Sequence, residues 1–215
     1  DVYKRQDITM TTPKTVSGGI ATFDDITGTK AGTYTLVAST GSLEDLTSSE
    51  FSIDPAAAAS MEFGTAPSSF TAGTTMTAVT VRLLDAYGNL CTNDSTSSIA
   101  FAMGTKPEGG DITMTTPKTV SGGIATFDDI TGTKAGTYNL VASTGSLEDL
   151  TSSEFSIDPA VASKLLWVTS PASTATAGNS WTTFSIEITD AYGNRITTGD
   201  HSTDTITIVP STGSF

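Results

Sequence analysis

One block of fifty residues occurs twice in this chain. Residues 7–56 return as residues 111–160 with a single difference, which is Thr35 in the first copy and Asn139 in the second. The two copies are offset by 104 residues, which is the size of one small all-β domain. The chain is therefore predicted to be a stretch of a tandem array in which each repeat folds as one module.

The rest of the repeat is less similar but still aligns. The motif Asp-Ala-Tyr-Gly-Asn at 85–89 returns at 190–194, displaced by one inserted residue. Asp-Pro-Ala links at 54–57 and 158–161 separate the repeats, because proline cannot continue a ladder of backbone hydrogen bonds. The alignment predicts four parts: adaptor-like residues at 1–6, the C-terminal half of a truncated module at 7–57, a complete module at 58–161, and the N-terminal half of a truncated module at 162–215.

The first six residues, DVYKRQ, have no counterpart ahead of the second copy. They resemble translated sequencing-adaptor remnants, so we expect them to lie outside the native protein and its fold. The two half-modules together carry one full set of strands, and each is expected to expose an apolar sheet face when left alone.

The complete module has the sequence pattern of β-strands. Val79, Val81 and Leu83 alternate with other residues, as expected of a strand with one face on a core. Similar short segments follow, separated by Gly, Asn, Asp and Pro, which predicts seven or eight strands in the module. That spacing is typical of an immunoglobulin-like β-sandwich, so the predicted fold is all-β with tandem sandwich modules. The predicted core residues are Val79, Val81, Leu83, Phe101, Phe127, Tyr138, Leu140 and Phe155.

Two local motifs predict defined structures. Asp85 is expected to accept hydrogen bonds from the backbone of its own turn, and Gly88 is expected to adopt a positive φ. Tyr138, in Ala-Gly-Thr-Tyr-Asn-Leu, is predicted to form a tyrosine corner. In that structure the tyrosine opens a late strand and its hydroxyl bonds to nearby backbone.

The combined pattern TAG…DAYGN…GGIATF…AGTYTL…F.I resembles the immunoglobulin-like repeats of large bacterial surface and adhesin-type proteins, in the style of invasin and intimin. The resemblance covers residues 7–215. Filamin-type repeats share the Gly-x-Tyr strand and are the second resemblance. The first resemblance implies modules that act as extended spacers, a few of which bear ligand sites, at an extracellular or cell-surface location.

The charge of the chain limits its partners. A net charge of −13 and a pI near 4.1 would repel nucleic-acid phosphates and anionic membrane surfaces, so neither is an expected partner. No apolar run approaches the roughly 18 residues of a transmembrane helix. Thr and Ser make up close to a third of the chain, and Thr suits exposed strand positions.

No residue is predicted to be catalytic or to bind a cofactor. His201 is the single histidine and lies in a polar loop, where a solvated side chain is expected. Cys91 is the single cysteine, so it forms no disulfide within the chain, and its alignment with Ile196 favours a packed apolar role. The chain is therefore predicted not to be an enzyme.

Acidic residues offer the one alternative of a metal site. Asp85, Asn89, Asn93 and Asp94 lie near one turn, and calcium takes roughly six to eight oxygen ligands from such loops. No dedicated calcium-binding pattern is present, so turn capping and solvation are the favoured interpretation, and no metal residue is predicted. The recurrent acidic residues are Asp24, Asp25, Glu44, Asp45 and Glu50, with Asp128, Asp129, Glu148, Asp149 and Glu154 in the second copy.

The predicted function is structural: a spacer or stalk segment of a long, repeat-built extracellular surface protein that presents a distal adhesive region. Its expected partners are neighbouring modules of the same chain. The alternative is an adhesion module that binds a glycan or protein through its loops or through Thr-rich strand faces such as Thr113 and Thr115. A spacer predicts few exposed aromatic side chains, with Tyr87 and Tyr192 as the exceptions.

Overall fold

The computed structural model describes residues 8–145 and 147–211, which form β-strands, turns and loops. No helix occurs in these ranges, and so none is long and apolar enough to cross a membrane. The all-β fold predicted from the alternating pattern is confirmed. The adaptor-like residues 1–6 lie outside the described residues.

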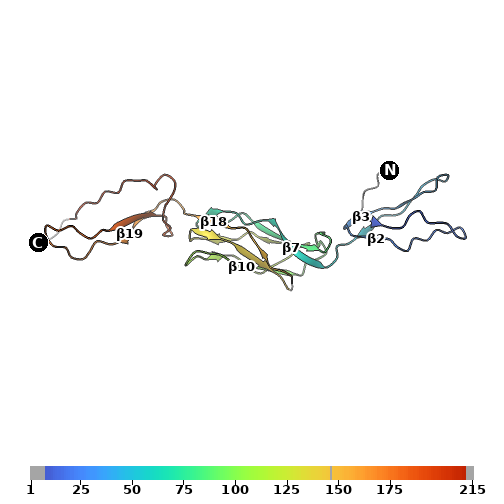
Figure 1. The fold of residues 1–215 in the computed structure, drawn as a ribbon, viewed down its shortest axis with the longest axis horizontal. Helices are drawn as coiled ribbons and strands as arrows, with labels where there is room; N and C mark the ends of the chain where they lie inside the picture. The colour runs from blue at the N-terminus through green and yellow to red at the C-terminus, as the bar shows by residue number, and fades with distance from the viewer. Residues whose placement is uncertain (1–7, 146, 212–215) are drawn as a thin grey trace.

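Three units follow one another along an elongated chain (Figure 1). We call residues 8–57 the N-terminal unit, residues 58–161 the central unit and residues 162–211 the C-terminal unit. All the buried apolar side chains among the described residues belong to the central unit. The interpretation of the two end units as truncated modules stays a prediction.

The central unit is an immunoglobulin-like β-sandwich. One sheet has the strand order β13-β9-β7, and the other has the order β12-β10-β16-β17. A third set, β15-β18-β8, contains a parallel pair, which is β18 with β8. The strands are β7 (Ala58–Thr65), β8 (Phe70–Thr71), β9 (Val79–Asp85), β10 (Ser98–Met103), β11 (Ile112–Thr113), β12 (Lys118–Thr119), β13 (Ile124–Phe127), β14 (Thr131–Gly132), β15 (Gly136–Tyr138), β16 (Leu140–Ser143), β17 (Leu150–Thr151) and β18 (Phe155–Asp158).

The core lies between the two main sheets. Phe101 of β10 and Phe127 of β13 meet with their ring centroids 4.2 Å apart, so both sheets contribute to one apolar cluster. All eight predicted core residues are buried, and the most exposed of them is Phe101 at 6%. The predicted core is therefore confirmed.

The number of strands differs from the prediction. The described part of the central unit contains twelve strands, where the sequence predicts seven or eight. Side chains interrupt the ladders, because the N–H of Phe101 donates to the hydroxyl of Thr116 and that of Leu140 to the hydroxyl of Ser152. The chain also changes partner at Asn139, since β15 pairs with β18 whereas β16 pairs with β10.

The end units repeat two halves of this sandwich in the same register. In the N-terminal unit, β1 pairs with β2 as β11 does with β14, β3 pairs with β6 as β15 does with β18, and β4 pairs with β5 as β16 does with β17. In the C-terminal unit, β19 pairs with β20 as β7 does with β9. The strands are β1 (Ile8–Thr9), β2 (Thr27–Gly28), β3 (Gly32–Tyr34), β4 (Val37–Ala38), β5 (Leu46–Thr47), β6 (Phe51–Ile53), β19 (Lys164–Thr169) and β20 (Ser185–Thr189).

Identical sequence is buried in one unit and exposed in another. Phe23 is 41% exposed in the N-terminal unit, whereas Phe127, at the same position of the repeat, is 0% exposed. Val16 and Val120 differ in the same way, at 60% and 2%. Strands β7, β9 and β10, which contribute to the two sheets around Phe127 and Val120 in the central unit, have no counterpart in the described part of the N-terminal unit.

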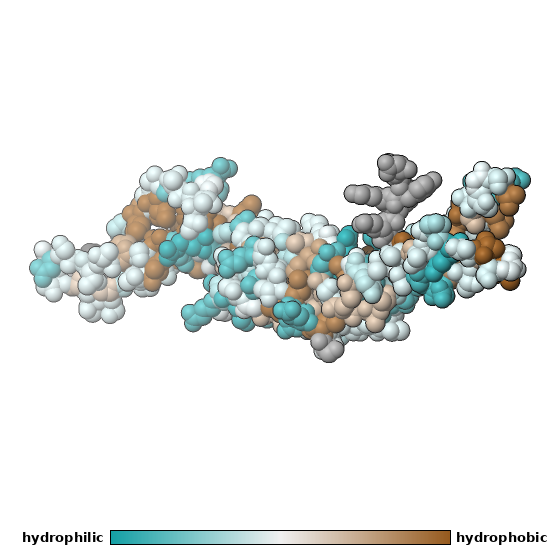
Figure 2. All heavy atoms as spheres, turned by 45° about the vertical axis from the view of Figure 1, so that its right-hand side comes forward, coloured by the Kyte–Doolittle hydropathy of each residue, from teal (hydrophilic) through white to brown (hydrophobic). Residues whose placement is uncertain are grey.

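Apolar surface is visible on both end units (Figure 2). In the C-terminal unit, Trp167 and Trp181 are exposed. We predicted that few aromatic side chains would be exposed, with Tyr87 and Tyr192 as the exceptions. That prediction is wrong, because these two tryptophans are exposed as well. These side chains are exposed because a sheet buries the side chains on its face only where a second sheet packs against that face.

Candidate functional site: the junctions between units

The Asp-Ala-Tyr-Gly-Asn turn follows β9 and lies at the junction with the N-terminal unit. The Oδ1 atom of the buried Asp85 accepts hydrogen bonds from the N–H groups of Tyr87 at 2.9 Å and Asn89 at 2.8 Å. Gly88 has a φ of 80°, in the left-handed region that favours glycine. The predicted structure of this turn is confirmed.

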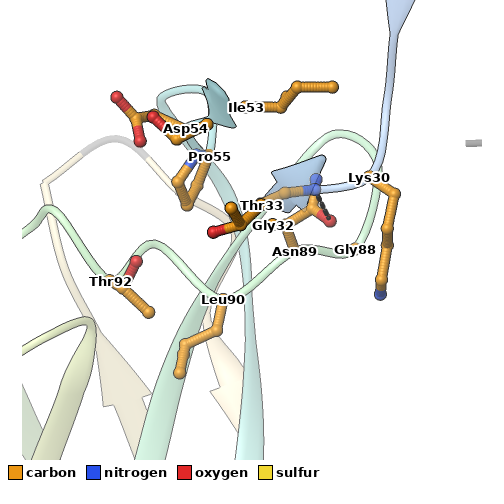
Figure 3. A pocket seen from close by; sticks show the side chains of 12 residues that line it. Lys30, Gly32, Thr33, Ile53, Asp54, Pro55, Gly88, Asn89, Leu90 and Thr92 are labelled. Atoms are coloured by element: carbon orange, nitrogen blue, oxygen red, sulfur yellow. Dashed lines mark hydrogen bonds between the residues drawn. The ribbon is translucent and has the colours of Figure 1, made fainter. Parts of the chain in front are cut away.

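Asn89 connects the central unit to the N-terminal unit. Its Oδ1 accepts a hydrogen bond from the N–H of Ala31 at 2.9 Å, and its Nδ2 donates to the carbonyl of Thr29 at 2.8 Å. Figure 3 shows Asn89 directed at this segment of the N-terminal unit, which precedes β3. Nδ2 also donates to Asp85 Oδ2 at 2.9 Å, so the aspartate orients the amide.

Asp85 also binds the link between the units. Its Oδ2 accepts a hydrogen bond from the N–H of Ala56 at 3.0 Å. Each carboxylate oxygen therefore accepts two hydrogen bonds. An ionised carboxylate offers about four acceptor positions, so these four donors leave none for a metal ion.

The junction between the central and C-terminal units repeats this arrangement. Asn194 accepts from the N–H of Ala135 at 2.8 Å and donates to the carbonyl of Thr133 at 2.7 Å. Asp190 accepts from the N–H of Ala160 at 2.9 Å and from Asn194 Nδ2 at 2.8 Å. We call the pairs Asp85–Asn89 and Asp190–Asn194, with their partners in the link and the preceding unit, the junction clamps.

Burial and hydrogen bonding act in opposite directions on the clamp aspartates. Desolvation raises the pKa of Asp85, but hydrogen bonds from Asn89, Ala56 and Tyr87 outweigh it and hold the pKa at about 2. The same balance lowers the pKa of Asp190 below its ordinary value. Both carboxylates are therefore ionised at neutral pH, and their hydrogen bonds are charge-assisted.

A tyrosine of the same turn adds a contact at the second junction. A Cβ atom at Gly73 would overlap with the hydroxyl of Tyr192, so the tyrosine lies directly over this glycine. Tyr192 is 50% exposed, against 62% for its equivalent Tyr87. Sequence reasoning missed this pairing, for which the recurrence of Thr-Ala-Gly together with the tyrosine turn was the available signal.

The acidic residues considered as calcium ligands have other partners or face solvent. Lys118 Nζ lies 3.5 Å from Asp128 and 3.6 Å from Asp129, and Lys14 lies in the same way beside Asp24 and Asp25. No group of three or more His, Cys, Asp or Glu side chains within 8–145 and 147–211 is arranged to hold a metal ion. The remaining acidic residues of this set are exposed: Glu44, Asp45, Glu50, Glu148, Asp149 and Glu154.

Two more polar residues near the first junction have structural roles. Hydrogen bonds from Ser97 and Thr96 lower the pKa of Asp94 to about 2, so this aspartate caps its own turn. Asn93 Nδ2 donates to the carbonyl of Pro55 in the link at 3.2 Å. All four side chains considered near this turn therefore form hydrogen bonds with other groups of the protein. These are Asp85, Asn89, Asn93 and Asp94.

His201 and Cys91 have the positions expected from the sequence. His201 is exposed, and its Nδ1 lies 2.7 Å from Asp204 Oδ2, a hydrogen bond that raises the pKa of the imidazole. Cys91 is buried in the apolar cluster, and burial raises the pKa of its thiol. A solvated histidine and a packed cysteine are confirmed.

The tyrosine corner forms, with one difference. The hydroxyl of Tyr138 donates to the carbonyl of Lys134 at 2.7 Å, as predicted. Tyr138 ends β15 and does not open a strand, because the ladder changes partner at the next residue. Thr113 lies in the two-residue strand β11 and Thr115 lies outside it, so they do not form a continuous Thr-bearing strand face.

No family model matches the chain, and no curated protein sequence matches it. Among solved structures, Yersinia pseudotuberculosis InvD is 21% identical, with a TM-score of 0.45 over 88% of this chain and 60% of that chain. Domains 5–6 of the S-layer protein SbsC are 15% identical, with a TM-score of 0.37 over 66% of each chain. A Bacteroides cellulosilyticus member of glycosyl hydrolase family 2 is 10% identical, with a TM-score of 0.41 over 62% of this chain and 18% of that chain. This chain thus spans less than two thirds of the InvD and hydrolase chains.

Proposed function

We propose that this chain is a non-catalytic spacer segment of a repeat-built surface protein, in which the junction clamps hold consecutive units in line. The observation that carries the proposal is that both junctions use the same six hydrogen bonds, whose corresponding lengths agree within 0.1 Å. A short link between folded units allows relative motion unless further contacts restrict it. The clamps supply such contacts at the link and on both sides of it.

The extracellular part of the proposal is supported by the resemblance to bacterial immunoglobulin-like surface repeats. A net charge of −13 suits a soluble segment that contacts neither nucleic acid nor anionic lipid. A distal adhesive region would then lie beyond the segment, and the segment would set its distance from the cell.

Single-molecule fluorescence energy transfer tests the alignment. Dyes are placed on cysteines introduced at the exposed positions Ser49 and Lys106, in a Cys91→Ala background. At sub-nanomolar concentration we expect one narrow distribution of transfer efficiency, which Asn89→Ala broadens because the unit-to-unit hydrogen bonds are lost. Asn179→Ala, at an exposed position away from this junction, is the control. A distribution that is equally broad before and after Asn89→Ala would remove the basis of the spacer function.

Ligand binding is the alternative function, and the exposed Trp167 and Trp181 favour it, because exposed apolar patches mark interaction surfaces. A glycan array probed with the whole chain tests it. Saturable binding that Trp181→Ala abolishes would assign adhesion to this segment. The spacer function predicts no such binding.

A further inference from the structure

The loop between β14 and β15 of the central unit meets both the tyrosine corner and the junction clamp. The carbonyl of Thr133 and the N–H of Ala135 bond to the side-chain amide of Asn194 in the next unit. Between them lies Lys134, whose carbonyl accepts a hydrogen bond from the hydroxyl of Tyr138 at 2.7 Å. The backbone group that the tyrosine corner holds therefore lies between the two backbone groups that the clamp binds.

The first junction has the same arrangement. The hydroxyl of Tyr34 donates to the carbonyl of Lys30 at 2.8 Å. Asn89 binds the residues on either side of Lys30, which are Thr29 and Ala31. Figure 3 shows Asn89 beside the segment that carries Lys30. We call residues 29–31 and 133–135 the junction sockets, since each receives the clamp asparagine of the following unit.

One side-chain amide can bind a socket only when the two backbone groups have the correct spacing. The amide of Asn194 has an oxygen that accepts and a nitrogen that donates, so it needs an N–H and a carbonyl that point toward the same place. Residues 133–135 belong to no strand, so no ladder of backbone hydrogen bonds holds them. Ordering such a loop during docking would cost conformational entropy. A socket that is already shaped by its own unit avoids this cost.

We propose that the tyrosine of each corner is a positioning residue for the junction, in which its hydroxyl shapes the socket for the clamp of the next unit. Tyr138 has this role at the second junction and Tyr34 at the first. Each tyrosine acts through the lysine carbonyl to which it donates. The inference rests on the proposed spacer function, because it requires that the clamps hold consecutive units in line.

Tyr138 is suited to this role because its ring is fixed in the core. The side chain is fully buried, and its ring stacks on that of Phe155 with the centroids 6.1 Å apart. The start of the loop is held as well, since the N–H of Gly73 donates to the carbonyl of Gly132 at 2.8 Å. Gly73 in turn lies beneath Tyr192 of the next unit. The core of one unit therefore determines where the next unit binds.

The proposal also states what kind of unit a clamp accepts. The groups that Asn194 binds are main-chain groups, so the socket is recognised by the shape of its backbone. A preceding unit then needs a tyrosine corner, whereas the side chains of its socket can vary. Thr133, for example, is exposed and contributes its carbonyl to the clamp. Thr133→Ala should therefore leave the junction unchanged.

Single-molecule fluorescence energy transfer across the second junction tests the proposal. Dyes are placed on cysteines introduced at the exposed positions Ser153 and Ser170 of the whole chain, in the Cys91→Ala background. We expect one narrow distribution of transfer efficiency. Tyr138→Phe removes the hydroxyl but keeps the stacked ring, and it should broaden the distribution as much as Asn194→Ala does. Circular dichroism of each variant shows whether the strands remain folded.

A double variant separates positioning of the socket from a general loss of stability. If the hydroxyl of Tyr138 acts through the amide of Asn194, the two changes together should give a distribution no broader than Asn194→Ala alone. Thr133→Ala is the matched control within the socket and should leave the distribution narrow. A narrow distribution in Tyr138→Phe, or further broadening in the double variant, would overturn the proposal.

The first junction gives an independent test, which also decides the matter if Tyr138→Phe fails to fold. Tyr34→Phe should broaden the distribution for dyes at positions 49 and 106 and leave that for positions 153 and 170 narrow. Broadening at both junctions, or at neither, would refute the positioning role. If Asn194→Ala broadens the distribution and Tyr138→Phe does not, this inference fails and the spacer function stands. If Asn194→Ala also has no effect, the clamps do not align the units and both fail.

Discussion

At the scale of single residues, position in the sandwich decides what a side chain contributes. Phe127→Ala should lower the free energy of unfolding by about 3–5 kcal/mol, because it empties space in a packed core. Phe23→Ala changes the same residue in the same local sequence and should cost less than about 1 kcal/mol, because Phe23 is partly solvated. Urea unfolding followed by circular dichroism in dilute solution measures both. Equal losses in the two variants would contradict the difference in burial.

The half of each clamp that lies within its own turn could be predicted from the sequence, and the half that crosses the junction could not. Asp85 and Gly88 belong to a turn motif with known hydrogen-bonding geometry. Thr29 and Ala31 contribute only a backbone carbonyl and a backbone N–H. Any residue carries these groups, so no choice of side chain marks them.

At the scale of elements, alternation predicted the faces of the strands better than their ends. β9 follows the pattern along its whole length, with Val79, Val81 and Leu83 buried. β8 has two residues and pairs in parallel with β18, which lies far away in the sequence, so no local period reveals it. The breaks at Thr116 and Ser152 depend on which hydroxyl reaches a strand N–H, which is a property of the folded chain.

Ser152 allows a test of whether a hydroxyl that replaces a backbone hydrogen-bond partner stabilises the fold. Its hydroxyl accepts from the N–H of Leu140 at 3.0 Å and donates to the carbonyl of Ser153 at 2.8 Å. Ser152→Ala should therefore cost about 1–3 kcal/mol, because it leaves a buried N–H without an acceptor. Ser48→Ala removes the equivalent, exposed hydroxyl and is the control, with a small expected effect. Thermal unfolding of both variants provides the comparison, and no loss of stability in Ser152→Ala would show that water replaces the hydroxyl.

At the scale of the whole molecule, the clamps determine how the chain responds to calcium. The oxygens of Asp85 and Asp190 are already occupied by N–H donors. Millimolar calcium should therefore shift the melting temperature by no more than a few degrees. A bound ion at a hundredfold excess over its Kd would stabilise by about 2.7 kcal/mol. A large upward shift that a chelator reverses would place a calcium site in the chain.

Acidic pH should loosen the junction that holds the units in line. The pKa of Asp85 is lowered from an ordinary 3.8 to about 2, and that of Asp190 is also lowered, so both contribute fully above the ordinary value. Their contribution is lost as the pH falls through the lowered pKa, because a protonated carboxyl cannot accept all four hydrogen bonds. The transfer-efficiency distribution for the dyes at positions 49 and 106 should therefore broaden as the pH falls from about 4 toward 2.

Asp85→Asn separates the clamp from the other carboxylates, which are also protonated over this range. The variant keeps the shape of the side chain but replaces one acceptor oxygen with a donor amide, so the first junction should already be loose at neutral pH. Its distribution should then be broad throughout and should change little with acid. If the variant stays narrow at neutral pH and broadens like the parent chain, the acid response arises from other carboxylates. The ionised clamp would then not be what holds the units in line.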